Sequence, residues 1–126
     1  EGQAAIELEY LACQFETKSS YRLIVKENKV QWQNCILEIL GDLKQKLPKA
    51  EIAHKFHNYL VDIIIYFSKS IGEQKVVLSG GCFQNRLLTE NAIKALEKNG
   101  FKPYWHQRIP PNDGGIALGQ IFIASL

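Results

Sequence analysis

The chain has 126 residues, of which 46% are hydrophobic and 22% charged, which suits one domain with an apolar core and excludes a disordered chain. Its 15 basic and 13 acidic residues give a net charge of only +2, which does not favour binding to nucleic acid or to an anionic membrane. The longest apolar run, around residues 63–67, is far shorter than a membrane-spanning helix.

The first half of the sequence is predicted to be mostly helical. Apolar residues at helical spacing predict a helix over 2–14. β-Branched and aromatic residues on both sides of the polar stretch 26–29 predict either a hairpin or a short strand with a turn. A second helix is predicted over 34–47, with its apolar side chains on one face, and the longest periodic segment predicts a third over 49–70.

The second half alternates strands and helices. A buried strand is predicted over 75–79, a helix over 87–98, a second strand over 101–105, and a last helix over 116–126 after a turn-rich loop. Two strands joined by a crossover helix normally lie parallel. The predicted fold class is therefore α/β, with several helices packed over a small sheet.

Each predicted strand is followed by a glycine-containing turn. Ser79-Gly80-Gly81 follows the first strand, and the loop Pro110–Gly115 follows the second. In open α/β sheets, ligands bind at the carboxyl ends of the strands. Both turns lead into helix N-termini, whose N–H groups favour anions such as phosphate. Neither turn is a P-loop or a complete dinucleotide fingerprint, so a nucleotide site is one interpretation and a pair of tight turns is the other.

Two polar side chains in these turns are candidate ligands. Asn85 has the donor and acceptor groups to bond a base edge or a ribose. Asp113, between Asn112 and Gly114, could bind a metal or orient a phosphate-bound magnesium ion. The run Asn112-Asp113-Gly114-Gly115 is equally suited to forming a turn with a helix cap, so the spacing leaves both interpretations of this loop open.

The histidines give weaker signals. His54 and His57 are three residues apart on a predicted helix and could share a face as a metal pair. Because no third ligand lies nearby in the sequence, a surface or partly buried structural pair is the better interpretation. A structural role is also expected for His106, which follows the second strand.

The cysteines favour a reducing environment. They are odd in number, lie far apart and form no CxxC pair, which argues against a cysteine zinc site and favours the cytoplasm. Cys82, beside Gly81, is expected to pack as a small hydrophobic side chain. The three positions are Cys13, Cys35 and Cys82.

Four segments of the chain resemble one family. LSGGCFQNRLL at 78–88 and PPNDGGIALGQ at 110–120 look like the C-terminal end of the hydrogenase maturation carbamoyltransferases, the HypF family. EGQAAIELEYLA at 1–12 and IAHKFHNYL at 52–60 are similar to the same family's preceding segments. The resemblance implies an actin/Hsp70/sugar-kinase-like nucleotide-binding fold. Residues 1–126 would be one lobe, without an internal boundary, at the end of a larger protein, which agrees with a first residue other than Met.

The resemblance also implies a reaction. In the family, an upstream domain makes carbamoyl-adenylate from carbamoyl phosphate and ATP. The final domain passes the carbamoyl group to the C-terminal cysteine of the partner protein HypE, in the maturation of [NiFe] hydrogenase. The lobe alone is expected to be inactive, or nearly so, because the other lobe of the site is absent.

The family's binding roles carry over to particular residues. Glu1 and Gly2 match the segment that lies near the ribose, and Asp113 matches an acidic residue that helps to hold a divalent metal (Mg, Zn or Fe) beside the phosphates. The other metal ligands are histidines of the absent lobe. The motif that holds the adenosine part matches Ser79, Gly80, Gly81 and Asn85.

Two other functions stay open. A tRNA threonylcarbamoyl transferase shares the fold and the AMP leaving group, but the FQN after the glycines and the intact PPNDGG favour the hydrogenase branch. A tRNA substrate would also favour a more basic surface. The alternative from a different class is a non-catalytic interaction module that kept the fold and lost nucleotide affinity.

Overall fold

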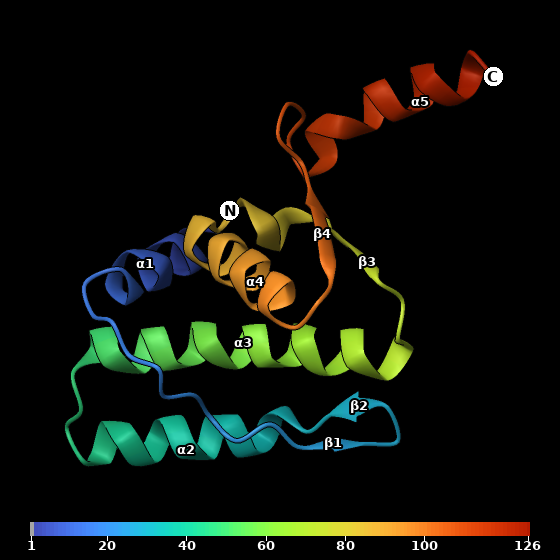
Figure 1. Cartoon of the computed structure of the whole chain (residues 1–126). Helices are drawn as coiled ribbons and strands as arrows, with labels where there is room; N and C mark the ends of the chain where they lie inside the picture. The colour runs from blue at the N-terminus through green and yellow to red at the C-terminus, as the bar shows by residue number, and fades with distance from the viewer. Residues whose placement is uncertain (1) are drawn as a thin grey trace. The chain divides into compact units, whose positions relative to one another are not determined.

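A computed structural model describes residues 2–126 and divides into two compact units, one up to Ile71 and one from Gly72 to Leu126 (Figure 1). Glu1, expected near a ribose, lies outside the described residues. This division does not test the expected single lobe, which stays a prediction. Among the described residues no helix has the length and apolar character needed to cross a membrane.

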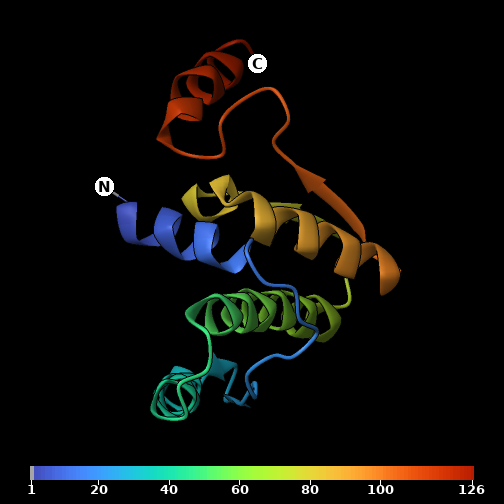
Figure 2. The same ribbon diagram turned by 90° about the vertical axis from the view of Figure 1, so that its left-hand side faces the viewer.

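The first unit consists of three helices and a hairpin. Its elements are α1 (Gln3–Ala12), β1 (Val25–Lys26), β2 (Lys29–Val30), α2 (Trp32–Lys44) and α3 (Lys49–Ile71). The two strands pair antiparallel, and α2 and α3 lie side by side in both views (Figures 1 and 2). The predicted helices and hairpin are confirmed, although α2 begins before the predicted start at residue 34.

The hydrophobic core of this unit forms between α3, α2 and the segment that precedes the hairpin. Partly buried apolar residues surround the core, mostly from the same elements, together with Val30 of β2 and Leu47 between α2 and α3. α1 also packs on α3, where the buried His54 Nδ1 donates a hydrogen bond to the Ala12 carbonyl over 3.0 Å. The four buried residues of this core are Tyr21, Cys35, Ile52 and Tyr59.

The two histidines of α3 are more buried than expected. His54 is 7% exposed and His57 is 1% exposed, so the prediction of a surface or partly buried pair is wrong. His57 Nδ1 donates to the carbonyl of Ala53 over 2.8 Å. Each imidazole therefore has a structural hydrogen bond to the backbone, which offsets the cost of burying a polar ring.

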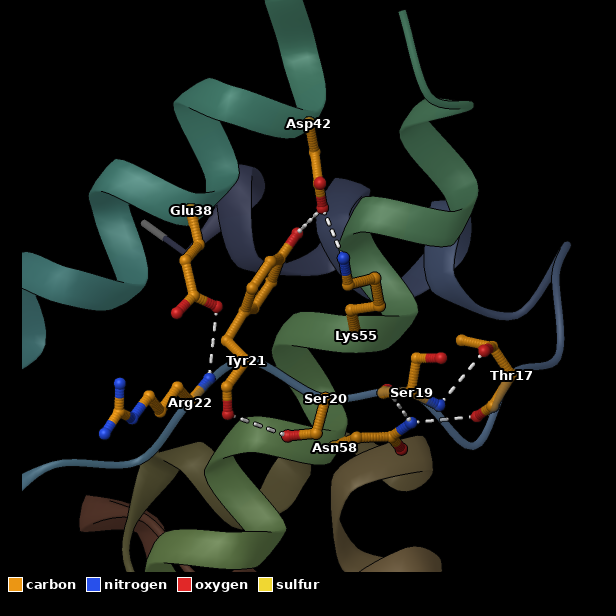
Figure 3. Close-up of polar contacts among 9 residues, drawn as sticks. All are labelled: Thr17, Ser19, Ser20, Tyr21, Arg22, Glu38, Asp42, Lys55 and Asn58. Carbon is orange, nitrogen blue, oxygen red and sulfur yellow. Dashed lines mark hydrogen bonds and ion pairs between the residues drawn. The ribbon is translucent and has the colours of Figure 1, made fainter. Parts of the chain in front are cut away.

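A polar network ties the segment before the hairpin to α2 and α3 (Figure 3). The Tyr21 hydroxyl donates to Asp42 Oδ2 over 2.9 Å, and Lys55 Nζ donates to the same oxygen. Lys55 also lies over the Tyr21 ring, 4.5 Å from its centre. Burial acts to raise the pKa of Asp42, but the hydrogen bonds from Lys55 and Tyr21 outweigh it and lower that pKa. The same segment is held by Asn58 Nδ2, which donates to two backbone carbonyls.

The second unit is a strand–helix–strand motif followed by a loop and a helix. The strands pair parallel, with Leu78 opposite Trp105, and α4 packs on β4 (Figure 1). This confirms the predicted crossover connection and the small sheet. Its elements are β3 (Lys75–Leu78), the 3₁₀ turn η1 (Gly81–Gln84), α4 (Arg86–Lys98), β4 (Lys102–Trp105), η2 (Asp113–Gly115) and α5 (Ile116–Ala124).

Two predictions about burial in this unit are wrong. The first strand is not buried throughout, because Val77 is 69% exposed while Leu78 is 2% exposed. Successive side chains of a strand point to opposite faces, and one face of β3 is left open by the described residues. Cys82, expected to pack as a small hydrophobic residue, is exposed in η1.

Candidate functional site

The two glycine-containing turns meet at the carboxyl ends of the paired strands. The Gly80 N–H donates to the carbonyl oxygen of Pro111 over 2.9 Å. The Ser79 hydroxyl and His106 Nε2 are 2.8 Å apart and share a hydrogen bond. The parallel register explains the second contact, because Ser79 directly follows Leu78 and His106 directly follows its partner Trp105. The prediction that both turns lie at the carboxyl ends of the strands is thereby confirmed.

Two glycines of these turns occupy positions that disfavour a side chain, for two different reasons. Gly80 has φ of 99°, a conformation that side chains with a Cβ rarely adopt. Gly115 has an ordinary φ, but a Cβ there would come within 3.1 Å of the Pro110 carbonyl oxygen and 3.2 Å of Ile109. Gly80 thus allows the backbone conformation of the first turn, and Gly115 allows the close packing of the second. The Gly80 N–H is already used by Pro111, so it is not one of the donors expected to face an anion.

Asn85 caps the helix that follows the first turn. Its side-chain oxygen accepts a hydrogen bond from the Leu88 N–H over 2.8 Å, at the N-terminus of α4. Thr89 adds hydrogen bonds to the carbonyls of Phe83 and Asn85, at 3.0 Å and 2.8 Å. Asn85 is therefore a helix cap, a role not predicted from the sequence, and its contact with adenosine stays a prediction.

Asp113 opens the short turn η2 in the second loop. The loop is shaped by its neighbour Asn112, whose side-chain oxygen accepts from the Gly114 N–H over 3.1 Å. Asp113 itself is exposed. Within residues 2–126, no three histidine, cysteine, aspartate or glutamate side chains are grouped so that they could hold a metal ion. One exposed carboxylate does not bind a divalent metal tightly, so the described residues do not make a metal site by themselves.

The remaining predicted ligand residue belongs to the first unit. Gly2 stands at the N-terminus of α1 with φ of 81°, and its carbonyl accepts hydrogen bonds from the N–H groups of Ala5 and Ile6, both at 3.1 Å. This gives Gly2 a helix-starting role. The other five predicted residues, Ser79, Gly80, Gly81, Asn85 and Asp113, lie in the second unit.

A mostly apolar hollow of about 710 Å³ opens beside the two turns. Its polar lining includes Ser79, His106 and Asn112, and α5 supplies much of its apolar wall. From the sequence, only a structural role is predicted for His106. One signal could have placed it in the site, since His106 follows the second strand as Ser79 follows the first, and parallel pairing aligns the two positions.

Comparison with known proteins identifies the family. The model of the family described as "Carbamoyltransferase, Kae1-like Domain, second subdomain" matches residues 1–120. The chain belongs to the HypF carbamoyltransferase family. The HypF resemblance drawn from the glycine motifs is thus confirmed.

Curated HypF proteins match nearly the whole chain. Carbamoyltransferase HypF of Synechocystis is 45% identical over 125 residues, which is 96% of this chain and 16% of that protein. Probable carbamoyltransferase HypF of Methanocaldococcus jannaschii is 30% identical over 124 residues, 95% of this chain and again 16% of the relative. The chain therefore spans about a sixth of the length of these HypF relatives.

Solved HypF structures share the fold. A crystal structure of full-length HypF in the phosphate- and nucleotide-bound form matches 98% of this chain and 17% of that protein, with a TM-score of 0.85 and 40% identity. The HypF structure from T. kodakarensis matches 99% of this chain and 17% of that protein, with a TM-score of 0.77 and 24% identity, a likeness of fold. The mixed helical fold with a small sheet is thus that of the HypF Kae1-like domain.

Proposed function

We propose that this chain is the adenylate-binding half of the carbamoyl-transferring site of a HypF-type enzyme. It works as part of a longer polypeptide with an actin/Hsp70-like nucleotide-binding domain, of which it is the second lobe. Carbamoyl-adenylate, made upstream from carbamoyl phosphate and ATP, is its ligand, and the C-terminal cysteine of HypE is the acceptor. Free thiols at Cys13, Cys35 and Cys82 agree with a cytoplasmic enzyme.

The observation that supports this proposal most strongly is the link between the two turns. Gly80 is hydrogen-bonded to Pro111, and Ser79 to His106, so residues far apart in the sequence form one surface at the carboxyl ends of β3 and β4. Ligands of α/β sheets bind at this end. A solved relative that is 40% identical was crystallised in a phosphate- and nucleotide-bound form.

In the proposed reaction these residues bind and orient carbamoyl-adenylate, and they do not react with it. The acceptor thiolate attacks the carbonyl carbon of carbamoyl-adenylate, so a C–S bond forms and the C–O bond to the phosphate breaks. AMP leaves with the bonding electron pair, and the thiol proton passes to solvent. Because the nucleophile comes from the partner, the contribution of this chain is positioning, which converts a bimolecular encounter into a reaction between aligned groups.

Asp113 is proposed to contribute one ligand to a divalent metal whose other ligands lie outside this chain. Its exposed position in the loop beside Pro111 leaves the carboxylate open to the first lobe of the proposed domain. Carboxylate oxygen is a ligand that hard divalent cations prefer.

Substitution of Asn85 tests the nucleotide site in the complete polypeptide. Asn85→Ala removes both the helix cap and the amide, whereas Asn85→Ser keeps a capping oxygen and removes the amide. If the amide contacts adenosine, both variants weaken AMP binding roughly three- to ten-fold, measured by calorimetric titration. A Gly80→Val variant, whose turn is strained, shows how much AMP binds elsewhere in the protein.

The result with serine separates the two roles of Asn85. An Asn85→Ser variant that binds AMP like the wild type, beside a weakened Asn85→Ala variant, would restrict Asn85 to capping. If wild type and Gly80→Val bind AMP equally, the turn is no nucleotide site, and the interaction-module alternative becomes the better explanation. Carbamoyl-type transfer to tRNA instead of to a protein thiol would favour the tRNA-modifying alternative.

Substitution of Asp113 tests the proposed metal ligand. Asp113→Asn is nearly isosteric but uncharged, so it should abolish carbamoyl transfer in the complete enzyme and leave AMP binding within about two-fold of wild type. Transfer is followed as the mass increase of the acceptor protein. Unchanged transfer would remove Asp113 from the site.

A further inference from the structure

The side chains of Ser79 and His106, the residues directly after β3 and β4, face one another. β3 ends at Leu78 and β4 at its partner Trp105, and the next residue of each strand supplies one member of the pair. Ser79 Oγ and His106 Nε2 are 2.8 Å apart, and both residues line the same hollow. The pair is therefore a product of the sheet register, placed at the mouth of the site.

The pair is not explained by a need for stability. Both residues are exposed, so water would satisfy either side chain if the other were removed. Exposed polar contacts of this kind contribute little to folding. The two loops are already joined by the backbone hydrogen bond from Gly80 to Pro111. Folding does not depend on this hydrogen bond, and Ser79 is the residue expected to face the ligand. The hydrogen bond is therefore expected to act on ligand binding.

We infer that His106 is a positioning residue, which acts through Ser79 and fixes the direction in which the Ser79 hydroxyl meets the nucleotide. This inference rests on the proposed adenylate-binding function. A serine hydroxyl has three staggered positions. The bond to Nε2 selects one of them before the ligand arrives, and it leaves the remaining donor or acceptor capacity of the hydroxyl for the ligand. Such preorganisation raises affinity by lowering the entropy lost on binding.

The size of the effect follows from the number of positions removed. Selecting one rotamer of three is worth about three-fold in affinity, and polarisation of the hydroxyl by the imidazole adds to it. His106→Ala should therefore weaken AMP binding roughly three- to ten-fold. Ser79→Ala should weaken it at least as much, because it removes the contact itself.

A double-mutant cycle in the complete polypeptide tests the inference. AMP affinity is titrated for the wild type, His106→Ala, Ser79→Ala and the double variant, with Gly80→Val as the background for AMP bound elsewhere. His106→Gln supplies a neutral amide that reaches about as far as Nε2, and should restore most of the affinity. Gln107→Ala, at the adjacent exposed position, is the control and should bind AMP like the wild type.

Thermal unfolding of each variant separates positioning from a structural role. The inference predicts unchanged melting temperatures, a double variant no weaker than Ser79→Ala, and recovery in His106→Gln. It is overturned if the two single effects add, or if His106→Ala binds AMP like the wild type while Ser79→Ala does not. If neither Ser79→Ala nor Gly80→Val alters AMP binding, the proposed adenylate-binding function is contradicted as well. This outcome distinguishes failure of the proposed function from failure of the inference about His106 alone.

Discussion

Two buried tyrosines of the first unit differ in the hydrogen bonding of their hydroxyl groups. Tyr21 donates to Asp42, whose carboxylate also binds Lys55 (Figure 3). Tyr59, 3% exposed, has a buried hydroxyl without a hydrogen-bond partner among the described residues. Burial is the main cause that raises the pKa of both phenols, and for Tyr21 the bond to Asp42 adds to it. The same substitution at the two positions therefore has different expected effects.

Removal of each hydroxyl measures this difference. Tyr21→Phe should lower the free energy of unfolding by about 1–2 kcal/mol, because a buried hydrogen bond to a charged group is lost. Tyr59→Phe should leave it unchanged or raise it by up to about 1 kcal/mol, because an unpaired buried hydroxyl is removed. Denaturant unfolding at pH 7 gives both values. Equal destabilisation in both variants would mean that Tyr59 has a partner, such as a buried water.

Cys35 is expected to make stability fall at alkaline pH. Burial, and then the negative charge of Glu38, raise the pKa of its thiol to about 11 from an ordinary value near 9. The folded state therefore holds this proton more tightly, so its contribution to stability is complete below about pH 9 and is lost as the pH rises towards 11. Cys35→Ala should reduce the slope of unfolding free energy against pH in this window, whatever constant cost its small cavity adds.

Alkylation provides a check on the same thiol. Cys35 is 1% exposed, whereas Cys13 and Cys82 are exposed. Iodoacetamide at pH 8 should label the two exposed cysteines first, as read by mass spectrometry. An equal rate at Cys35 would contradict its burial.

At the scale of elements, α5 is the most unusual helix of the second unit. Apolar side chains lie on all sides of it, and Gln120 is its polar exception. A soluble domain rarely exposes an apolar patch of this extent without a partner surface. The exposed large apolar side chains of α5, each between 49% and 72% exposed, are Ile116, Leu118, Ile121, Phe122 and Ile123, and Leu126, just after the helix, is 92% exposed.

The exposed surface of α5 should limit the behaviour of this chain when it is produced alone. We expect self-association at micromolar concentration, measured by light scattering, because association removes apolar surface from water. The double variant Ile121→Lys/Phe122→Lys should reduce it. Gln120→Lys adds charge to the same helix without removing apolar surface, and is the control. If the wild type and the Gln120→Lys variant both stay monomeric, the expectation is contradicted.

Most elements could be predicted because their signals are local. The apolar period of α3, the glycines after β3 and the capping residue Asn85 each act within a few residues of the chain. Burial could not be predicted as well, since it depends on what covers a face. The apolar face of α2 looks like a core face in the sequence, yet Leu37 is 65% exposed and Leu40 is 48% exposed. Periodicity identifies a face that needs covering, and not the element that covers it.

At the scale of the whole molecule, the sequence located the candidate site but not its internal contacts. The two turns could be brought together by one rule, that parallel strands end at the same edge. The bond between Ser79 and His106 needed the register as well, which aligns Leu78 with Trp105. This chain spans 16% of the length of each of two HypF relatives, so its contacts are those of one part of such proteins.

The hydrogen bond from Gly80 to Pro111 turns one backbone amide into a reporter. The loops cannot separate without breaking this bond, and a broken bond leaves the Gly80 amide proton open to exchange with deuterium from the solvent. The exchange rate of this amide in the complete protein therefore reports the fraction of molecules in which the two loops are apart. A ligand that bridges them would slow that exchange without touching the amide itself.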